Sequence, residues 1–168
     1  MLKQIPVDSI SMNVFQAIGK QWMLITAGDR EDCNTMTASW GGLGILWGKP
    51  AATAYVRPQR YTHSYMQRED YFTLSFLPET YRKALAYCGS HSGREEDKWA
   101  ASGLTPAFTE QGVPYVAEAE LVRVVRKQFC QRMEGESILD QEVKDLDYPE
   151  ADYHYIYIGQ IMEAYKAF

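Results

Sequence analysis

The stretch NTMTASWGGLG, from Asn34 to Gly44, has the residue types of a segment that lines a ligand. It offers an amide, three hydroxyl groups and one indole between two apolar runs. The small residues around Ala38 leave the backbone lightly covered, and the glycines would let a ligand approach it closely. The stretch is therefore either a ligand-lining loop or a turn on the way into a core.

A second stretch, YVRPQRYTHS, places two arginines beside the expected start of a helix. Arg57 and Arg60 precede Thr62, which sits at that start. Free N–H groups at a helix N-terminus and two guanidinium groups together favour an anion, so this stretch predicts a phosphate site. In the alternative interpretation, the arginines pair with surface acids and Thr62 only caps the helix.

A third stretch, YCGSHSGREEDKW, carries further polar groups. The spacing of Ser92 and Glu95 matches a capping box and predicts a second helix start, with Lys98 one turn in. A serine and a lysine placed in this way could reach a ligand. Alternatively, Ser92 only caps the helix and Lys98 is a solvated charge on an acidic helix.

Other catalytic patterns fail. The glycine run would need a glycine at Trp47 to match the dinucleotide fingerprint, and Gly44–Lys49 is one residue too short for a phosphate loop. The three histidines lack a paired metal spacing, and no serine or cysteine stands in a nucleophile elbow. We therefore expect no metal site and no catalytic side chain, so that any difficult chemistry would belong to a cofactor.

The composition restricts the class of protein. With 46% hydrophobic and 23% charged residues over 168 positions, the chain is expected to form a single globular domain, residues 1–168. The net charge of −5 argues against a nucleic-acid partner. No apolar run is long enough to span a membrane, and the N-terminus lacks the apolar core of a signal peptide. Three widely spaced cysteines suit a reducing cytoplasm.

Apolar alternation and turn residues predict six or seven strands and about three short helices. Strands are expected at 22–26, 35–38, 51–56 and 71–76, and in two long extended segments at 116–129 and 153–168. Helical turns are expected at 9–18, 61–68, 80–88 and 92–103. The little alternation between strands and helices favours an antiparallel barrel over a doubly wound fold.

Two details of the long segments carry further expectations. The apolar phase changes between Leu121 and Val122, which predicts a bulge or a sharp coil of the strand there. The last segment is apolar or aromatic on both faces around Tyr155, Ile156 and Tyr157. A second subunit or a ligand is expected to cover its outer face.

Taken in order, NTMTASWGG, VRPQRYTHSYM, YCGSHSGREEDKW and HYIYIGQI resemble the flavin reductase-like family, and within it the flavoredoxin-type branch. The resemblance runs from about Trp22 to Phe168. It implies a mainly β fold, the FMN-binding split β-barrel, which is a Greek-key antiparallel barrel with a few short helices. It also implies a homodimer with flavin near the subunit interface.

The resemblance also assigns site residues. Asn34 and the Thr37–Trp40 loop would lie along the isoalloxazine and the ribityl chain, and Arg57, Arg60 and Thr62 would gather round the phosphate. Phe168 would close over a ring, whereas the Phe129–Ser137 stretch receives no role. The implied cofactor-binding set is Asn34, Met36, Thr37, Ala38, Ser39, Trp40, Arg57, Arg60, Tyr61, Thr62, Ser92, Lys98 and Phe168.

The implied activity is hydride transfer from NADH or NADPH to flavin, followed by electron delivery to another acceptor. Amide donors near the N1/O2 edge would stabilise the negative charge of reduced flavin. The branch favours FMN over FAD. Two alternatives stay open: a non-catalytic FMN electron carrier, and a binder of another flat cofactor such as haem, for which His63, His91 or His154 would be the axial ligand.

Overall fold

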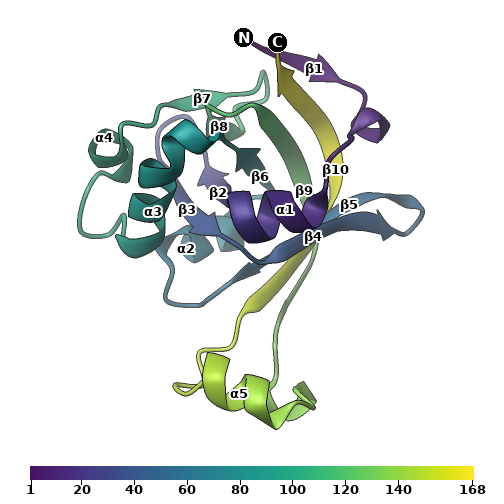
Figure 1. The fold of residues 1–168 in the computed structure, drawn as a ribbon, viewed down its shortest axis with the longest axis vertical. Coiled ribbons are helices and arrows are strands. Elements are labelled where there is room, and N and C mark those ends of the chain that lie inside the picture. The colour runs from purple at the N-terminus through teal and green to yellow at the C-terminus, as the bar shows by residue number, and fades with distance from the viewer.

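An antiparallel sheet that wraps around one apolar core organises the chain (Figure 1). The computed structural model describes residues 1–168. The sheet contains eight strands: β1 (Leu2–Ile5), β2 (Met23–Gly28), β3 (Cys33–Ala38), β4 (Gly41–Leu46), β5 (Lys49–Val56), β6 (Tyr71–Phe76), β9 (Leu121–Arg132) and β10 (Tyr155–Ala167). Two short strands, β7 (Pro106–Phe108) and β8 (Pro114–Val116), form a separate hairpin.

The strand order makes the barrel split. Seven strands follow one another as β3-β2-β6-β9-β10-β5-β4, and β1 pairs with β10 outside this path. β3 and β4 are consecutive in the sequence but stand at opposite ends of the order, and no backbone pairing joins them. Only Ser39 and Trp40 connect the two strands. The barrel therefore opens on the side where the first candidate stretch lies.

The sheet is buried on both faces over part of its width. Met23 and Ile25 of β2 belong to the barrel core, while Leu24 between them packs in a second apolar cluster under a helix. This second cluster includes Leu85 and Cys88 of α3 (Arg82–Ser90). β2 is fully buried along its length, which explains why its sequence is a continuous apolar run.

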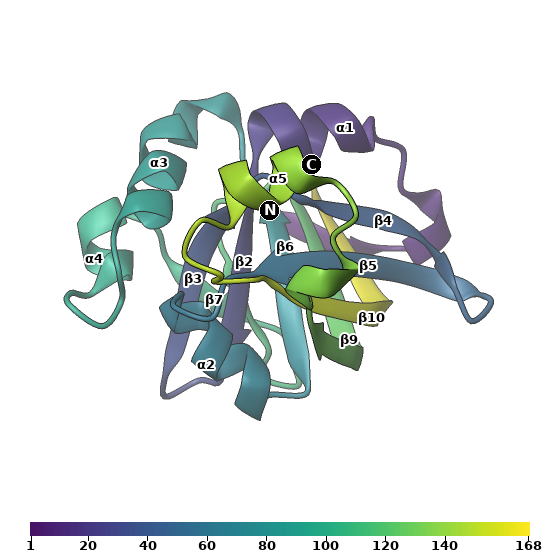
Figure 2. The same cartoon turned by 90° about the horizontal axis from the view of Figure 1, so that it is seen from below.

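The helices cover the outside of the barrel. Figure 2 shows α3 and α4 (Lys98–Ser102) on the side of β3, with α2 (Tyr61–Arg68) below the sheet. α1 (Val14–Gln16) continues into a π turn at Ala17–Gln21. No helix is long and apolar enough to cross a membrane.

Several expected elements are confirmed, two helices begin later than expected, and the strand expected at 116–129 begins only at Leu121. The helix at 61–68 and the strand at 71–76 agree to the residue. The first helical segment begins at Val14 rather than at Ser9, because Asn13 caps it by accepting a hydrogen bond from the backbone N–H of Gln16. The 92–103 helix begins at Lys98, because Asp97 accepts from the N–H groups of Trp99 and Ala100.

The bulge expected between Leu121 and Val122 is not there. Residues 117–120 form a turn, so the change of apolar phase marks the start of β9. The register with β10 instead shifts at Gln128 and at Met162. Gly159 lies at the first shift, where a Cβ atom would be 2.2 Å from the carbonyl oxygen of Arg126. A side chain at this position would therefore push the two strands apart.

Two aromatic residues of the last segment have contacts within their own chain. Tyr157 is fully buried in the barrel core of its own chain. Tyr155 packs on His63, with ring centroids 4.3 Å apart. The aromatic residues of β10 thus have intramolecular contacts, and Tyr157 does not belong to an interface between subunits.

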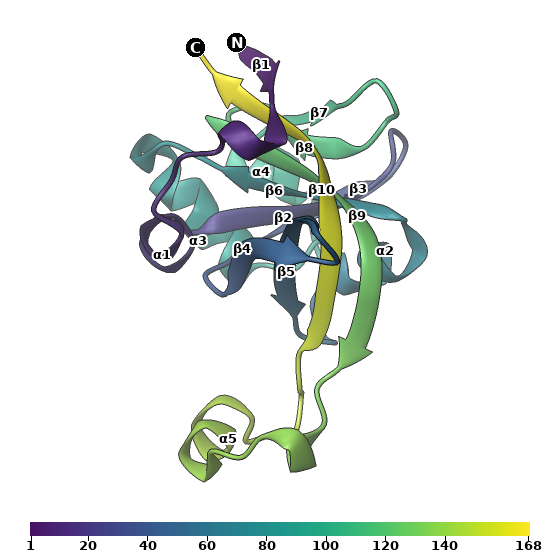
Figure 3. The ribbon, with the colours of Figure 1, turned by 90° about the vertical axis from the view of Figure 1, so that its right-hand side faces the viewer.

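An arm of residues 133–154 leaves the barrel between β9 and β10 and extends away from it (Figure 3). It carries α5 (Gln141–Asp147), capped by Asp140. This helix was not expected from the sequence. The N- and C-terminal ends lie side by side at the opposite end of the molecule, because β1 pairs with the last residues of β10.

Candidate functional site

Two adjoining cavities lie along β3 at the split side of the barrel. The larger measures about 240 Å³ and the smaller about 130 Å³. Both are lined by Met36 and Arg60, so they form one groove, which we call the β3 groove. Of the thirteen predicted site residues, all but Phe168 line it. Tyr55, Gln59, Ser90, His91, Gly93 and His154 line it as well.

β3 can serve as a wall of this groove because it is an edge strand. The indole Nε1–H of Trp99 donates to the carbonyl oxygen of Cys33 at 3.0 Å, so Cys33 directs its backbone away from β2. By the alternation of an antiparallel strand, Thr35 and Thr37 direct their N–H and C=O groups the same way. The side chains of Asn34, Met36 and Ala38, at alternate positions, point to one face of the strand and line the groove.

The glycine part of the opening stretch is a strand, not a loop. Gly41 begins β4, and its φ of 156° is in a range that favours glycine. A Cβ atom there would lie 2.8 Å from the carbonyl oxygen of Thr53 and 2.9 Å from Cε of Met23. The glycine therefore allows β4 to lie close to β5 and the core. Only Ser39 and Trp40 remain as a connecting loop.

Asn34 is held in place from two sides. Its Nδ2 donates to Oγ1 of Thr62 at 2.9 Å, and both residues are buried. On the other side is Gly93, where a Cβ atom would be 2.3 Å from Oδ1 of Asn34 and 3.0 Å from Cδ1 of Tyr61. α2 and the loop before α4 thus fix one amide at the smaller end of the groove. Thr62 provides no helix cap, contrary to the alternative interpretation.

Two cations converge at this end, Lys98 buried and Arg60 half-buried. Arg60 donates to the carbonyl oxygens of Gly89 and Cys88 at 2.8 and 3.2 Å. Lys98, only 2% exposed, donates from Nζ to the same Cys88 oxygen at 2.7 Å. These carbonyls belong to the last turn of α3, whose dipole favours cations. Lys98 is thus a buried group, not a solvated one.

Neither cation has a carboxylate partner. Arg60 and Lys98 form no salt bridge. Burial lowers the pKa of the Lys98 ammonium to about 8, and burial also lowers the pKa of the Arg60 guanidinium. A buried positive charge without an opposite charge is costly. An anionic group bound between these side chains would remove that cost, and Tyr61 and Thr62 at the start of α2 line the same cavity.

Arg57 lines the larger cavity and is already paired with an acid. Its Nη1 lies 2.8 Å from Oδ2 of Asp152, and its Nη2 donates to the carbonyl oxygen of Asp147 at 2.8 Å. The guanidinium also lies over the ring of Tyr148 at 5.1 Å. Arg57 therefore joins the groove to the α5 arm, and its charge is already paired. The alternative of an arginine paired with an acid is confirmed here.

The larger end of the groove is aromatic. Trp40, 46% exposed, and His154 lie with ring centroids 5.2 Å apart. Nδ1 of His154 is 2.7 Å from the hydroxyl of Tyr148. Burial, and then the nearby Arg57, lower the pKa of His154 to about 4, so its ring is neutral at pH 7. His154 and Tyr55 were missed as site residues because strand pairing brings them to Trp40 from distant positions in the sequence.

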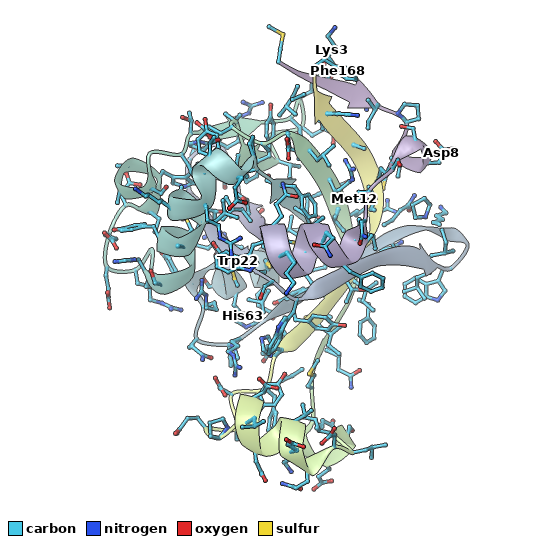
Figure 4. All side chains as sticks on the ribbon, in the orientation of Figure 1. Lys3, Asp8, Met12, Trp22, His63 and Phe168 are labelled. Atoms are coloured by element: carbon cyan, nitrogen blue, oxygen red, sulfur yellow. The ribbon has the colours of Figure 1, made fainter.

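The last two predicted residues have different outcomes. Ser92 lines the smaller cavity but accepts from the N–H of Arg94 in a turn, without capping a helix. Phe168 is 74% exposed and lies beside Lys3 at the end of β10, away from His63 near the groove (Figure 4). Within one chain, Phe168 is therefore not brought to the site.

Comparisons with known proteins agree with this geometry. A family model described as "Flavin reductase like domain" matches residues 15–166. Flavoredoxin from Methanosarcina acetivorans is 20% identical, with a TM-score of 0.70 over 88% of this chain and 68% of that one. The FMN-binding protein from Thermus thermophilus, solved with 1-cyclohex-2-enone, is 19% identical, with a TM-score of 0.70 over 98% and 80% of the two chains.

A third solved structure adds a reductase. The NADH:FAD oxidoreductase from Streptomyces globisporus C-1027, in complex with NAD and FAD fragments, is 18% identical. Its TM-score is 0.65, over 88% of this chain and 74% of that one. No curated protein sequence matches this chain significantly. At these identities, the solved structures show a shared fold.

Proposed function

Because the chain belongs to the flavin reductase-like family, we propose that it is an FMN-binding flavoprotein that takes hydride from NADH or NADPH. The observation that carries this proposal is the charge pattern of the β3 groove. Two cations without a carboxylate partner, Arg60 and Lys98, lie at one end. At the other end are the indole of Trp40 and the neutral ring of His154, and the charge of Arg57 there is already paired with Asp152. FMN has the matching polarity, with an anionic phosphate at one end and a flat ring system at the other.

The residues present fit this cofactor. Arg60 and Lys98, with the first N–H groups of α2, would hold the phosphate. Asn34 lies at the smaller end of the groove, with the two cations, and would face the ribityl hydroxyls next to the phosphate. Trp40 and His154 would lie against the ring system. Arg57, whose charge is paired with Asp152, would act on the cofactor only indirectly, through the position of the α5 arm.

A second cleft supports FMN over FAD. It measures about 630 Å³ and adjoins the phosphate end, since Asn34, Tyr61, Gly93 and Lys98 line both. Five acids line this cleft, Glu31, Asp32, Glu95, Glu96 and Asp97, against three bases, Arg30, Arg94 and Lys98, so that its charge is negative on balance. A second phosphate and an adenosine extending in this direction would meet like charges. A mononucleotide avoids this repulsion.

The bound flavin would supply the hydride-accepting chemistry, and the chain would orient it and stabilise its charge. The edge backbone of β3 and the connection at Ser39 offer N–H groups that no strand pairs. Such fixed donors stabilise negative charge better than water does, because they need no reorganisation. Neutral His154 is a candidate donor or acceptor at the ring, and no protein acid or base is required for the transfer itself.

The homodimer remains part of the proposal. Exposed apolar side chains support it: Ile45 and Trp47 on the β4–β5 hairpin. Sedimentation at working concentrations tests it. A dimer is expected, and a monomer over that range would contradict this part of the proposal.

The second candidate is an electron carrier that does not oxidise nicotinamide. The exposed edge of Trp40 beside the groove favours it, since a carrier needs only an exposed flavin edge and a docking surface. Anaerobic mixing of the flavin-loaded protein with NADH or NADPH separates the two. Bleaching of the flavin absorption band by a saturating concentration of either nucleotide would support the reductase. A loaded protein that is bleached by dithionite but by neither nucleotide would support the carrier.

A further inference from the structure

A separate apolar cleft of about 930 Å³ lies next to the β3 groove, between the α1 segment and β4. Met12, at the start of this segment, is visible beside α1 in Figure 4. The apolar side chains that line the cleft are Met12, Val14, Phe15, Ile18, Trp40 and Leu43. No lysine, arginine, aspartate or glutamate lines it. The cleft thus suits a ligand without charge.

The cleft opens at the aromatic end of the groove. It shares Ser39, Trp40 and Tyr55 with the larger groove cavity, and no residue with the cavity that contains Lys98. A molecule in the cleft would therefore approach the ring system of a flavin held in the groove. It would be separated from the phosphate by the whole length of the groove.

The polar groups of the cleft are few. Oδ1 of Asn13 already accepts from the N–H of Gln16, and the hydroxyl groups of Ser39 and Tyr55 lie at the boundary with the groove. A nicotinamide dinucleotide carries two phosphates and would find no cation there. Ile45 and Trp47 lie outside the cleft, on the β4–β5 hairpin. These two exposed side chains are better suited than the cleft to a flat contact between subunits.

From this geometry we propose that the cleft binds the terminal electron acceptor, a neutral, planar, quinone-like molecule. This inference rests on the proposed function. In the net reaction, NAD(P)H and one proton convert the quinone to its hydroquinone and release NAD(P)⁺. Two electrons and two protons are added to the quinone. Continuity with the groove places the acceptor against the electron source, and the uncharged lining selects for neutral molecules.

Two glycines of β4 offer a matched test. A Cβ atom at Gly42 or at Gly44 would meet no atom within 4 Å, so both accept a side chain without a clash. Gly42 lines the cleft, whereas Gly44, two residues further along the same strand, does not. Gly42→Glu places a carboxylate on a residue of the cleft wall, and Gly44→Glu places the same carboxylate on the same strand beyond the cleft.

Duroquinone is a suitable acceptor because its ring is fully substituted and does not alkylate thiols such as that of exposed Cys130. Ferricyanide, an anionic acceptor that needs no apolar subsite, gives the reference rate. We expect Gly42→Glu to lower the ratio of kcat/KM for duroquinone to that for ferricyanide at least tenfold, with Gly44→Glu unchanged. Equilibrium dialysis of the flavin-loaded proteins should show the same loss of duroquinone binding.

Three outcomes would overturn the inference: duroquinone that does not bind, equal effects of the two glutamates, or no effect of Gly42→Glu. Dissociation of a dimer by Gly42→Glu would also overturn it, because a second copy would then fill the cleft. Failure of the proposed function is distinguishable. In that case NAD(P)H would not be oxidised even with ferricyanide, although dialysis could still detect duroquinone in the cleft.

Discussion

Replacement of Arg60 by alanine tests the assignment of the phosphate end. The guanidinium is half-buried and donates only to two carbonyl oxygens, of Gly89 and Cys88. A charge-assisted hydrogen bond from such a group to a phosphate contributes about 1.5–3 kcal/mol. At about 1.4 kcal/mol per factor of ten, Arg60→Ala should weaken FMN binding by roughly 10- to 150-fold.

Riboflavin separates this effect from a general disturbance of the groove. It carries the same ring system and ribityl chain but no phosphate, so its affinity should change by less than about threefold in Arg60→Ala. Flavin fluorescence quenching by the apoprotein measures both affinities. Arg57→Ala is the control, since its charge is paired with Asp152. We expect it to change the FMN-to-riboflavin affinity ratio much less than Arg60→Ala does.

The reasoning would be refuted by either of two results. Equal weakening of FMN and riboflavin in Arg60→Ala would mean that the side chain supports the groove without contacting the phosphate. A larger loss of FMN selectivity in Arg57→Ala than in Arg60→Ala would mean that the charge pairing does not decide which arginine binds.

Three further predictions concern the neighbouring residues. FMN affinity should fall as the pH rises from 7 to 9, because the pKa of Lys98 is about 8 and the neutral amine loses its attraction for phosphate. Lys98→Met, titrated with FMN over the same range, should lose most of this pH dependence, and an unchanged dependence of affinity on pH would contradict the prediction. The unfolding free energy should fall as the pH drops from about 6.5 towards 4, because the pKa of His154 is depressed to about 4 and the unfolded chain binds the proton first. Denaturant titrations at several pH values should show that the unfolding free energy of His154→Gln depends less steeply on pH, and an equal dependence on pH would refute this. Gly93→Ala should cost about 1–3 kcal/mol of stability and weaken FMN binding, because the new Cβ would meet Oδ1 of Asn34 at 2.3 Å, whereas Gly44→Ala should change neither in melting and binding experiments.

The sequence predicted the fold because its signals were local and ordered. The alternation from Tyr71 to Phe76 and the apolar run of β2 indicated strands that the structure confirms. The resemblance to flavin reductase-like proteins implied a split antiparallel barrel, and the fold agrees with it. Pattern reasoning failed where tertiary contacts decide the conformation. Gly41 reads as a turn residue but is a strand residue, required by a close approach to Thr53.

The candidate site was predictable in outline for similar reasons. The polar stretches beside β3, α2 and α4 are visible in the sequence, and the fold gathers them. The charge state of each residue was not visible. Arg57 and Arg60 look equivalent in the sequence, yet only the distant Asp152 determines which of them is already paired. His154 joins the groove through strand pairing and the α5 arm, which no local pattern indicated.

The central claim is that the β3 groove holds FMN. The most direct test is the visible absorption spectrum of the purified protein, followed by identification of any pigment released on denaturation, with added FMN if the protein is colourless. The account predicts a flavin spectrum and the release of FMN from the purified protein. If the protein is colourless, it should take up one FMN per chain and bind FAD only weakly. A colourless protein that does not bind added FMN would contradict the claim and leave only the fold in common with its relatives.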